Sequence, residues 1–287
     1  MALRVGFIGL GNQGKPIAAH LAPAGFETTV YDVVEAPTRE LAETGARVAG
    51  SPREVAQAAD VIGICVPEDD HVRAVVAGPD GILEGAAPGT VIAVHSTVLP
   101  ETVQALAEQA AAKGVSLLDA CVTGGAARAE QKQLTYLVGG DAEVLEKARP
   151  MLEASSVKII HAGELGNGAR LKLCLNLITY IQWAAAYESF HLARAAGLPT
   201  EVLEEAGRAN GQLTDLMVQY LTTHKMPAEA RASDAMQKYL RGHMHTAEKD
   251  LAWALKLARS SQVTLPVGGL VSQLMARLYG VEDEGRR

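Results

Sequence analysis

The first half of the chain alternates short apolar runs with stretches of helical periodicity. The apolar runs expected to form strands are residues 4–10, 27–33, a short one from Val48, 61–66, 91–95, 116–119, 135–139 and 155–161. Helices are expected between them at 12–24, at 38–44, after the capping sequence Ser51-Pro52-Arg53-Glu54, and at 101–113. Apolar runs that are bounded by turn residues and separated by helices are typical of βαβ units. This half therefore predicts an α/β fold with a mostly parallel sheet.

The pattern changes after residue 162. A helical pattern without Pro or Gly spans residues 169–196, and Gly197-Leu198-Pro199 signals its end. Further helices are expected at 200–209, 213–222, 247–260 and 266–279, and the tail 281–287 is expected to fray. We therefore predict an α/β domain over residues 1–162 and an all-helical domain over residues 163–287, which the long helix opens.

A glycine-rich turn, Gly9-Leu10-Gly11-Asn12-Gln13-Gly14, follows the first predicted strand. In a Rossmann-type domain such glycines allow a tight turn, the approach of a pyrophosphate and close packing of helix on strand. Asp32 ends the second predicted strand 23 residues later (32 − 9), near the spacing of about 20 at which an acid binds the adenosine ribose. The residues expected to bind the dinucleotide are Gly9, Gly11, Asn12, Gln13, Gly14 and Asp32. An ordinary glycine turn beside an unrelated acid is the alternative interpretation.

The charge of Asp32 bears on the choice of cofactor. A carboxylate there accepts hydrogen bonds from ribose hydroxyls and repels a 2′-phosphate, so NAD is expected in preference to NADP. Val33 and Val34 follow it, and the nearest cation, Arg39, is expected a turn into the next helix. The chain has no Gly-Lys-Ser/Thr phosphate-binding sequence, which disfavours ATP.

Charge and composition exclude several classes of partner. The 287 residues are 48% hydrophobic and carry a formal net charge of −7. This charge disfavours nucleic acid and anionic membranes, because both bind basic patches. No apolar run approaches the ~18 residues of a membrane span, and no signal-peptide pattern precedes the first strand. Cys65, Cys121 and Cys174 lie far apart and are expected to stay as thiols, so we expect a cytoplasmic protein.

The segment Asp119-Ala120-Cys121-Val122-Thr123-Gly124-Gly125 contains a candidate anion site, because two glycines after a hydroxyl residue expose consecutive N–H groups. Together with two later segments, it resembles the β-hydroxyacid dehydrogenases, the group that includes 3-hydroxyisobutyrate dehydrogenase and tartronate semialdehyde reductase. The resemblance implies that Thr123, Gly124 and Gly125 hold the substrate carboxylate. Three residues stand where the family usually has Pro, Ser and Gly: Cys121, Thr123 and Lys132.

The second segment, Gly166-Asn167-Gly168-Ala169-Arg170-Leu171-Lys172 followed by Asn176, resembles the catalytic motif of the same family. The spacing of four residues puts Lys172 and Asn176 on one face of the long helix, one turn apart. Both interrupt an apolar stretch, and buried Lys and Asn are costly unless they serve a partner. The resemblance implies that Lys172 is the general acid–base and that Asn176 assists it. Leu175 replaces an asparagine that many relatives carry.

The third segment, Lys249-Asp250-Leu251, is similar to the family's C-terminal signature. The resemblance implies that Lys249 approaches the nicotinamide end of the cofactor. It also places four residues along the nicotinamide half: Val66, Pro67, His71 and Thr97. His243-Met244-His245 indicates no metal site, because positions i and i+2 diverge on a helix and no third ligand is evident.

These motifs predict an NAD-dependent oxidoreductase that moves a hydride between the cofactor and a small carboxylate-bearing 3-hydroxy acid, similar to 3-hydroxyisobutyrate, or its semialdehyde or keto form. The resemblance implies a homodimer or homotetramer assembled mainly through the helical domain. Imine reductases share the architecture but typically lack the lysine at position 172, so they are the second enzyme class. A dinucleotide-binding protein without catalytic activity is a further alternative, which the Lys172/Asn176 pair disfavours.

Overall fold

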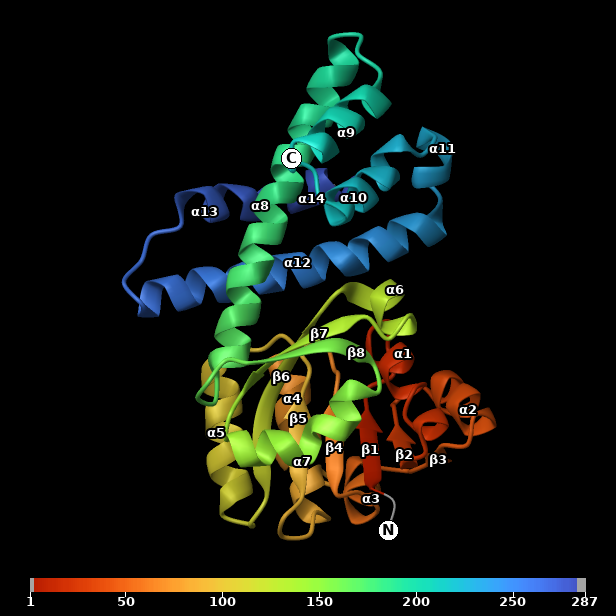
Figure 1. Ribbon diagram of the computed structural model, residues 1–287, viewed down its shortest axis with the longest axis vertical. Coiled ribbons are helices and arrows are strands. Elements are labelled where there is room, and N and C mark those ends of the chain that lie inside the picture. Colours follow the sequence, from red (N-terminus) through yellow and green to blue (C-terminus); the bar gives the residue numbers. More distant parts are fainter. Residues whose placement is uncertain (1–2, 283–287) are drawn as a thin grey trace. The chain divides into compact units, whose positions relative to one another are not determined.

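One eight-stranded sheet organises the first half of the protein in the computed structural model, which describes residues 3–282 (Figure 1). The strand order is β3-β2-β1-β4-β5-β6-β7-β8. The strands are β1 Arg4–Ile8, β2 Glu27–Tyr31, β3 Arg47–Val48, β4 Val61–Ile64, β5 Val91–Val94, β6 Ser116–Thr123, β7 Leu134–Gly139 and β8 Ser156–His161. All neighbours are parallel except β6 and β7, which pair antiparallel. The predicted α/β fold is confirmed.

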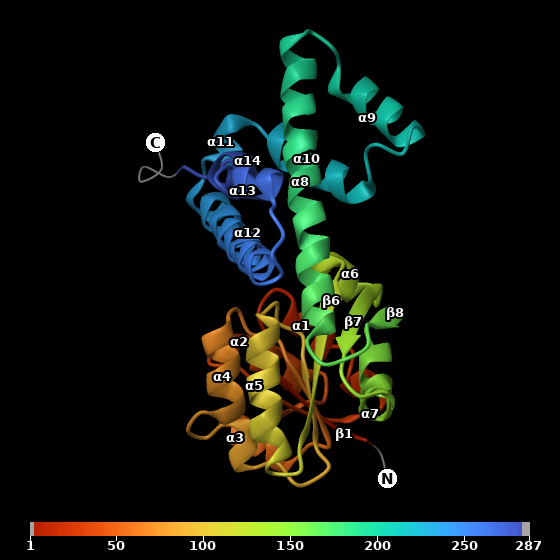
Figure 2. The ribbon, with the colours of Figure 1, turned by 90° about the vertical axis from the view of Figure 1, so that its left-hand side faces the viewer.

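Helices cover both faces of this sheet, because its strands are apolar on both sides. Val5 and Phe7 of β1 belong to the core on one face, and Ile62 and Ile64 of β4 belong to the core on the other. The first face is covered by α1 (Gly14–Ala18), α6 (Gly125–Glu130) and α7 (Ala142–Glu153), and the second by α3 (Pro52–Gln57), α4 (Asp69–Ala77) and α5 (Pro100–Ala111). Figure 2 shows these two layers with the sheet between them.

The carboxyl ends of β1, β2, β4 and β5 lie at one edge of the sheet, since these strands are parallel. The chain order reverses between β1 and β4, which is where a doubly wound sheet binds its ligand. Gly9, Asp32, Val66 and Thr97 follow the ends of these four strands. The fold thus gathers residues that are up to 88 positions apart (97 − 9) at one edge.

Five elements of this half differ from the sequence prediction. The helix expected at 12–24 is only α1 followed by a 3₁₀ turn at Ala22–Ala24, because Pro23 has no N–H to continue an α-helix. Strand β6 continues past Asp119 to Thr123, because β7 pairs with its second half. Helix α6, directly after the double glycine, was not predicted, and neither were α4 and α7. The cap at Ser51 is confirmed, since its hydroxyl accepts a hydrogen bond from the Glu54 amide at 3.2 Å.

The described residues after β8 form helices only. They are α8 Asn167–Ala195, α9 Thr200–Ala209, α10 Asp215–Lys225, α11 Ala228–Arg231, α12 Asp234–Ser260, α13 Pro266–Ser272 and α14 Met275–Tyr279. The chain divides into two compact units, Met1–Lys172, here called the sheet unit, and Leu173–Arg287, here called the helical unit. The division falls within α8, whereas the sequence pattern changes at residue 162.

Helix α12 begins thirteen residues before the predicted start at 247 (247 − 234). Its first half contains Gly242, His243 and His245, which favour helix weakly. Packing outweighs this, because a buried stripe recurs every three or four residues at Leu240, Met244, Ala247, Leu251 and Ala254. The helix predicted at 266–279 is divided into α13 and α14. Val281 of the predicted frayed tail is buried, and residues 283–287 lie outside the described part of the chain.

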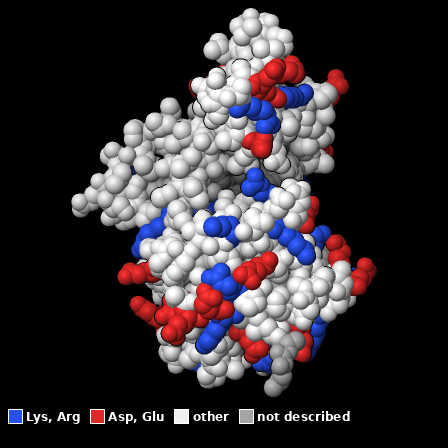
Figure 3. Space-filling view, in the orientation of Figure 1, with Lys and Arg blue, Asp and Glu red and all other residues white. Residues whose placement is uncertain are grey.

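Within residues 3–282, no helix is long and apolar enough to cross a membrane. On the face that Figure 3 shows, Lys and Arg side chains are interspersed with Asp and Glu side chains over the sheet unit. Ion pairs of the sheet unit include Arg4 with Asp60 and Lys15 with Glu40. This face presents mixed charge rather than a basic surface.

Candidate active site

The turn after β1 has the backbone conformation that its glycines predict. Gly9 has φ +90°, and a Cβ there would lie 2.3 Å from the Cys65 carbonyl oxygen. A Cβ on Gly14 would lie 1.9 Å from the Gly9 carbonyl oxygen, so neither position accepts a side chain. Gly11 differs, because a Cβ there would meet nothing within 4 Å. The protein's own packing therefore leaves open the position that a bound pyrophosphate needs.

Two further observations fit a dinucleotide at this turn. The Asp32 carboxylate accepts hydrogen bonds from the Leu10 and Val34 amides, so each oxygen keeps a lone pair for a ribose hydroxyl. The side-chain nitrogen of Gln13 is buried and has no hydrogen-bond partner among residues 3–282. A buried donor without a partner is costly, and a ligand oxygen would satisfy it. Asn12 lies exposed beside it.

The loops after β4 and β5 lie next to each other. The Val66 amide donates a hydrogen bond to the Ser96 hydroxyl at 2.9 Å, which joins the two strand ends. Val66 and Thr97 are half-buried in these loops, whereas Pro67 and, on α4, His71 are exposed. The sequence prediction gave Ser96 no role, because its contact with Val66 joins residues 30 positions apart.

His95 directly follows β5 and is buried in the core of the sheet unit. Its ring is 2% exposed, its Nδ1 is 2.8 Å from the Ala120 carbonyl oxygen, and it contacts the rings of Phe7 and Tyr136. Burial lowers the pKa of His95 to about 4, and the hydrogen bond with Ala120 only partly opposes this. A neutral, fully packed imidazole is therefore part of the core.

The loop after β6 presents backbone amides at the end of that strand. Thr123 is the last residue of β6 and pairs with Thr135 of β7. Gly124 and Gly125 follow with φ +130° and +75°, conformations that L side chains rarely adopt. Successive amides in such a turn form a concave donor site for an anion. Lys132, between α6 and β7, also has a left-handed backbone, with φ +58°.

Asp119, in the middle of β6, joins this strand to the start of α8. Its carboxylate is fully buried and accepts hydrogen bonds from the Gly166 amide at 2.8 Å and the Ala169 amide at 2.7 Å. Burial raises the pKa of Asp119, and those two hydrogen bonds oppose the rise. Gly168 allows the close approach, since a Cβ there would lie 2.4 Å from the Leu137 carbonyl oxygen. Lys172 lies three residues beyond Ala169 on the same helix.

The sequence prediction gave Asp119 no role. The feature that could have identified it is the presence of an acid within the otherwise apolar run of residues 117–122. A charge in a buried strand is costly unless it has partners. The pattern cannot name those partners, because Gly166 and Ala169 are about fifty positions away.

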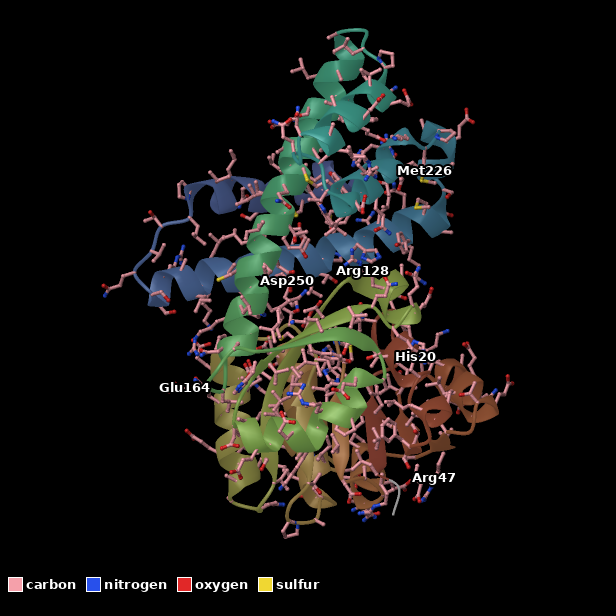
Figure 4. The ribbon with its side chains drawn as sticks, viewed as in Figure 1. His20, Arg47, Arg128, Glu164, Met226 and Asp250 are labelled. Atoms are coloured by element: carbon pink, nitrogen blue, oxygen red, sulfur yellow. The ribbon has the colours of Figure 1, made fainter. Side chains whose placement is uncertain are left out.

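The helical unit has a second buried carboxylate, Asp250 on α12, which Figure 4 labels where α12 crosses α8. Its Oδ2 accepts hydrogen bonds from the Asn176 side-chain amide at 2.6 Å and from the Tyr180 hydroxyl at 3.2 Å. Its Oδ1 is 3.2 Å from the Lys249 ammonium. Asn176 and Lys249, predicted from separate motifs, are thus brought together by Asp250. The sequence prediction gave neither Asp250 nor Tyr180 a role.

No group of three His, Cys, Asp or Glu side chains that could hold a metal ion occurs among residues 3–282. The ring of His243 packs edge-on against that of Tyr239, and His245 is 3.5 Å from Glu248 on the same helix. All three cysteines are thiols.

Comparisons with known proteins agree with this architecture. The family model described as the NAD-binding domain of 6-phosphogluconate dehydrogenase matches residues 4–163. The model described as NAD-binding of NADP-dependent 3-hydroxyisobutyrate dehydrogenase matches residues 166–286. The NAD-dependent L-serine dehydrogenase of Pseudomonas aeruginosa is 36% identical, with 94% of this chain and 90% of the relative covered. The 3-hydroxyisobutyrate dehydrogenase of the same organism is 35% identical, with coverage of 95% and 91%.

The chain belongs to the β-hydroxyacid dehydrogenase family. This dehydrogenase is also similar to a solved 3-hydroxyisobutyrate dehydrogenase of Mycobacterium tuberculosis, which was determined with L-serine. The two share 28% identity at a TM-score of 0.81, with 98% of this chain and 94% of that chain covered. The protein is an NAD-binding oxidoreductase, as the sequence predicted.

Proposed function

We propose that this dehydrogenase oxidises the hydroxyl group of a small 3-hydroxy acid, similar to 3-hydroxyisobutyrate, and catalyses the reverse reduction of the semialdehyde or keto form. One observation carries the proposal. Strand β6 ends at Thr123, and through Asp119 it also binds the first turn of α8, which bears Lys172. A candidate carboxylate site and a candidate acid–base are therefore attached to one rigid strand. The L-serine and 3-hydroxyisobutyrate dehydrogenases among the relatives support this substrate class.

We assign the dinucleotide to the glycine turn and the adjacent strand ends. Gly9, Gly11, Asn12, Gln13 and Gly14 bind the pyrophosphate region, and Asp32 binds the adenosine ribose. The nicotinamide half is assigned to Val66, Pro67, His71, Thr97 and Lys249. When bound, NAD⁺ supplies the hydride acceptor.

NAD is preferred over NADP in this proposal. Arg39, the nearest cation in the sequence after Asp32, forms an ion pair with Glu35 one turn before it on α2 (Glu35–Glu43). A 2′-phosphate would meet the Asp32 carboxylate and would have to compete with Glu35 for Arg39. Catalytic efficiency measured with each cofactor tests this preference, and equal values would contradict it.

Lys172 and Asn176 act on the substrate hydroxyl. In oxidation Lys172 accepts the hydroxyl proton as the hydride leaves the same carbon, and in reduction it returns that proton. Thr123 and the amides of Gly124 and Gly125 bind the carboxylate, which orients the hydroxyl-bearing carbon. Charge-assisted hydrogen bonds contribute about 1.5–3 kcal/mol each, so an amide or ester analogue should lose about 10- to 100-fold in kcat/KM.

The test is NADH formation with a panel of 3-hydroxy acids, carried out on the wild type and on Lys172→Ala. We expect Lys172→Ala to lose at least ~100-fold in turnover while NADH affinity barely changes, because the dinucleotide is held mainly by the sheet unit. Asn176→Ala should lose less. Lys147→Ala, an exposed lysine on α7, is the control and should keep full turnover. A Lys172→Ala enzyme with most of its turnover would overturn the assignment.

We also propose that the protein is a cytoplasmic homodimer or homotetramer assembled through the helical unit. This unit exposes several large apolar side chains, including Leu192 at 71% and Leu270 at 64%. Exposed apolar surface of this kind is typical of protein interfaces. Light scattering that gives the chain mass of 30.2 kDa across micromolar concentrations would contradict the assembly.

A further inference from the structure

Asp250 is a buried acid at 2% exposure, and Asn176, Tyr180 and Lys249 of the helical unit are among its partners. A carboxylate at this depth is costly unless hydrogen bonds and an opposite charge compensate for lost hydration. Here Asn176 and Tyr180 donate to one oxygen, and Lys249 supplies the opposite charge near the other. Burial, followed by the proximity of Asp250, raises the pKa of Tyr180 well above its usual value, so Tyr180 remains a protonated donor.

This arrangement fixes which way the Asn176 amide faces. A side-chain amide has a donating nitrogen and an accepting oxygen, and only the nitrogen can bond to a carboxylate. The 2.6 Å contact between Asn176 Nδ2 and Asp250 Oδ2 therefore excludes the flipped amide, which would set two oxygens against each other. The amide oxygen faces away from Asp250 and remains an acceptor. Asn176 lies one helical turn after Lys172.

We propose that Asp250 is a positioning residue, which holds the Asn176 amide so that its oxygen accepts a hydrogen bond from the Lys172 side chain. This inference rests on the proposed roles of Lys172 and Asn176. When the hydroxyl proton moves to the Lys172 nitrogen, the new ammonium gains an oriented acceptor, which favours the charged product of that step. Tyr180 supports the same geometry by donating to the carboxylate oxygen that Asn176 contacts.

Truncation at Asp250 is the first test. Asp250→Ala should lower kcat by about 10-fold or more while KM and NADH affinity change by less than about twofold, since Asn176 is then free to rotate. Asp250→Asn keeps an oxygen that can accept from Asn176, so it should lose only about threefold or less. Tyr180→Phe should lower kcat by a factor of about two to five.

Tyr220→Phe is the matched control for Tyr180→Phe. Tyr220 is also a buried tyrosine of the helical unit, and its hydroxyl donates to the Leu278 carbonyl at 2.6 Å. Both variants lose one buried hydroxyl and should lower the Tm, but only Tyr180→Phe should lower kcat. Equal kcat values for the two variants would assign Tyr180 to stability alone.

An exchange of the two side chains tests the direction of the hydrogen bond. Asn176→Asp should lose at least ~100-fold in kcat, because its new carboxylate would face the carboxylate of Asp250. The double variant Asn176→Asp/Asp250→Asn restores a donor facing an acceptor and should recover at least ~10-fold over Asn176→Asp. Its pH–rate profile for oxidation should shift to higher pH, because the carboxylate one turn from Lys172 favours the ammonium form. A double variant no more active than Asn176→Asp would overturn the proposal.

A spectroscopic measurement keeps the test independent of turnover. The asparagines of the chain are Asn12, Asn167, Asn176 and Asn210, so selective ¹⁵N-asparagine labelling gives a sparse side-chain amide spectrum. Asn176→Ala assigns the resonance of interest, and that resonance should move in Asp250→Ala. An unchanged resonance in folded Asp250→Ala would overturn the hydrogen bond itself.

If Lys172→Ala and Asn176→Ala lose turnover while Asp250→Ala does not, only this inference fails. If Lys172→Ala retains turnover, the proposed function fails.

Discussion

The two units build their candidate sites from different parts of the polypeptide. In the sheet unit the site is mostly backbone: glycines with positive φ, amides at strand ends and a turn that excludes Cβ atoms. In the helical unit it is made of side chains from two helices, joined through Asp250. Backbone sites depend on a local sequence pattern, whereas side-chain sites depend on which helices cross. The comparison predicts that substitutions act locally in the first unit and through partners in the second.

The glycine turn gives the largest expected effect and tests the backbone half of the comparison. Gly14→Ala should lower the free energy of unfolding of the sheet unit by at least about 3 kcal/mol, because its Cβ would lie 1.9 Å from the Gly9 carbonyl oxygen. Gly11→Ala should leave the Tm nearly unchanged, since its Cβ meets no protein atom within 4 Å. It should still weaken NADH binding by about 10- to 100-fold, measured by fluorescence titration. A Gly11→Ala protein with normal affinity would show that the open position does not face the ligand.

The next largest expected difference between the two units is their stability at low pH. Burial lowers the pKa of His95 in the sheet unit and of His224 in the helical unit to about 4 in each case. Such a histidine contributes its full stability above pH 6.5, its value when unfolded, and loses it as the pH falls toward 4, by about 3 kcal/mol in total. In the helical unit burial also lowers the pKa of His191 and His243. In the sheet unit the pKa of Asp119 is raised, so its folded form binds a proton more readily than its unfolded form. Asp119 therefore stabilises the folded sheet unit as the pH falls, which opposes the effect of His95. The helical unit should therefore unfold first.

Tryptophan fluorescence can follow this transition, because Trp183 and Trp253 both belong to the helical unit. His224→Gln retains a donor for the Leu278 carbonyl, which His224 Nε2 contacts at 2.9 Å. It should shift the acid midpoint to lower pH. His161→Gln, at an exposed position on β8, should not. Coincident unfolding of both units in the fluorescence and far-UV signals would contradict the order.

Substitution of two aspartates, Asp119 and Asp141, tests how far the stability and activity of the sheet unit depend on a side chain. Asp119 uses both carboxylate oxygens to accept from two amides, those of Gly166 just before α8 and Ala169 in its first turn, whereas Asp141 uses one oxygen for two amides at the start of α7. Asparagine offers one acceptor, so Asp119→Asn should cost about 2 kcal/mol and Asp141→Asn less than about 0.5 kcal/mol. Asp119→Asn should also lower kcat about 10-fold, because the turn before Lys172 shifts. Equal kcat values for both variants would remove Asp119 from the positioning of α8.

The sequence predicted the strands and the glycine turn well and the side-chain contacts poorly, for a physical reason. The Gly9–Gly14 turn and the β-strands have local signatures, namely glycine spacing and apolar runs. The start of α12 was placed late because His243 and Gly242 weaken the local helical signal, which packing of Leu240 and Met244 overrides. The bond between Asn176 and Asp250 joins positions 74 apart, and no local pattern encodes such a contact. Lys172 and Asn176 were found by resemblance, and their roles stay predictions.

The smallest expected effect concerns Lys132, a lysine in a left-handed backbone conformation in the sheet unit. Lys132 has φ +58°, a conformation that costs an L residue roughly 1–2 kcal/mol and costs glycine nothing. Lys132→Gly should therefore raise the free energy of unfolding by about 0.5–1 kcal/mol, after the greater flexibility of glycine in the unfolded chain is subtracted. Lys147→Gly, within α7, should lower it by about 1 kcal/mol, because that backbone is helical. Urea unfolding of both variants measures the difference. If Lys132→Gly destabilises the protein as much as Lys147→Gly does, the Lys132 side chain contributes contacts that outweigh its backbone strain, and this loop would resemble the helical unit in depending on side chains.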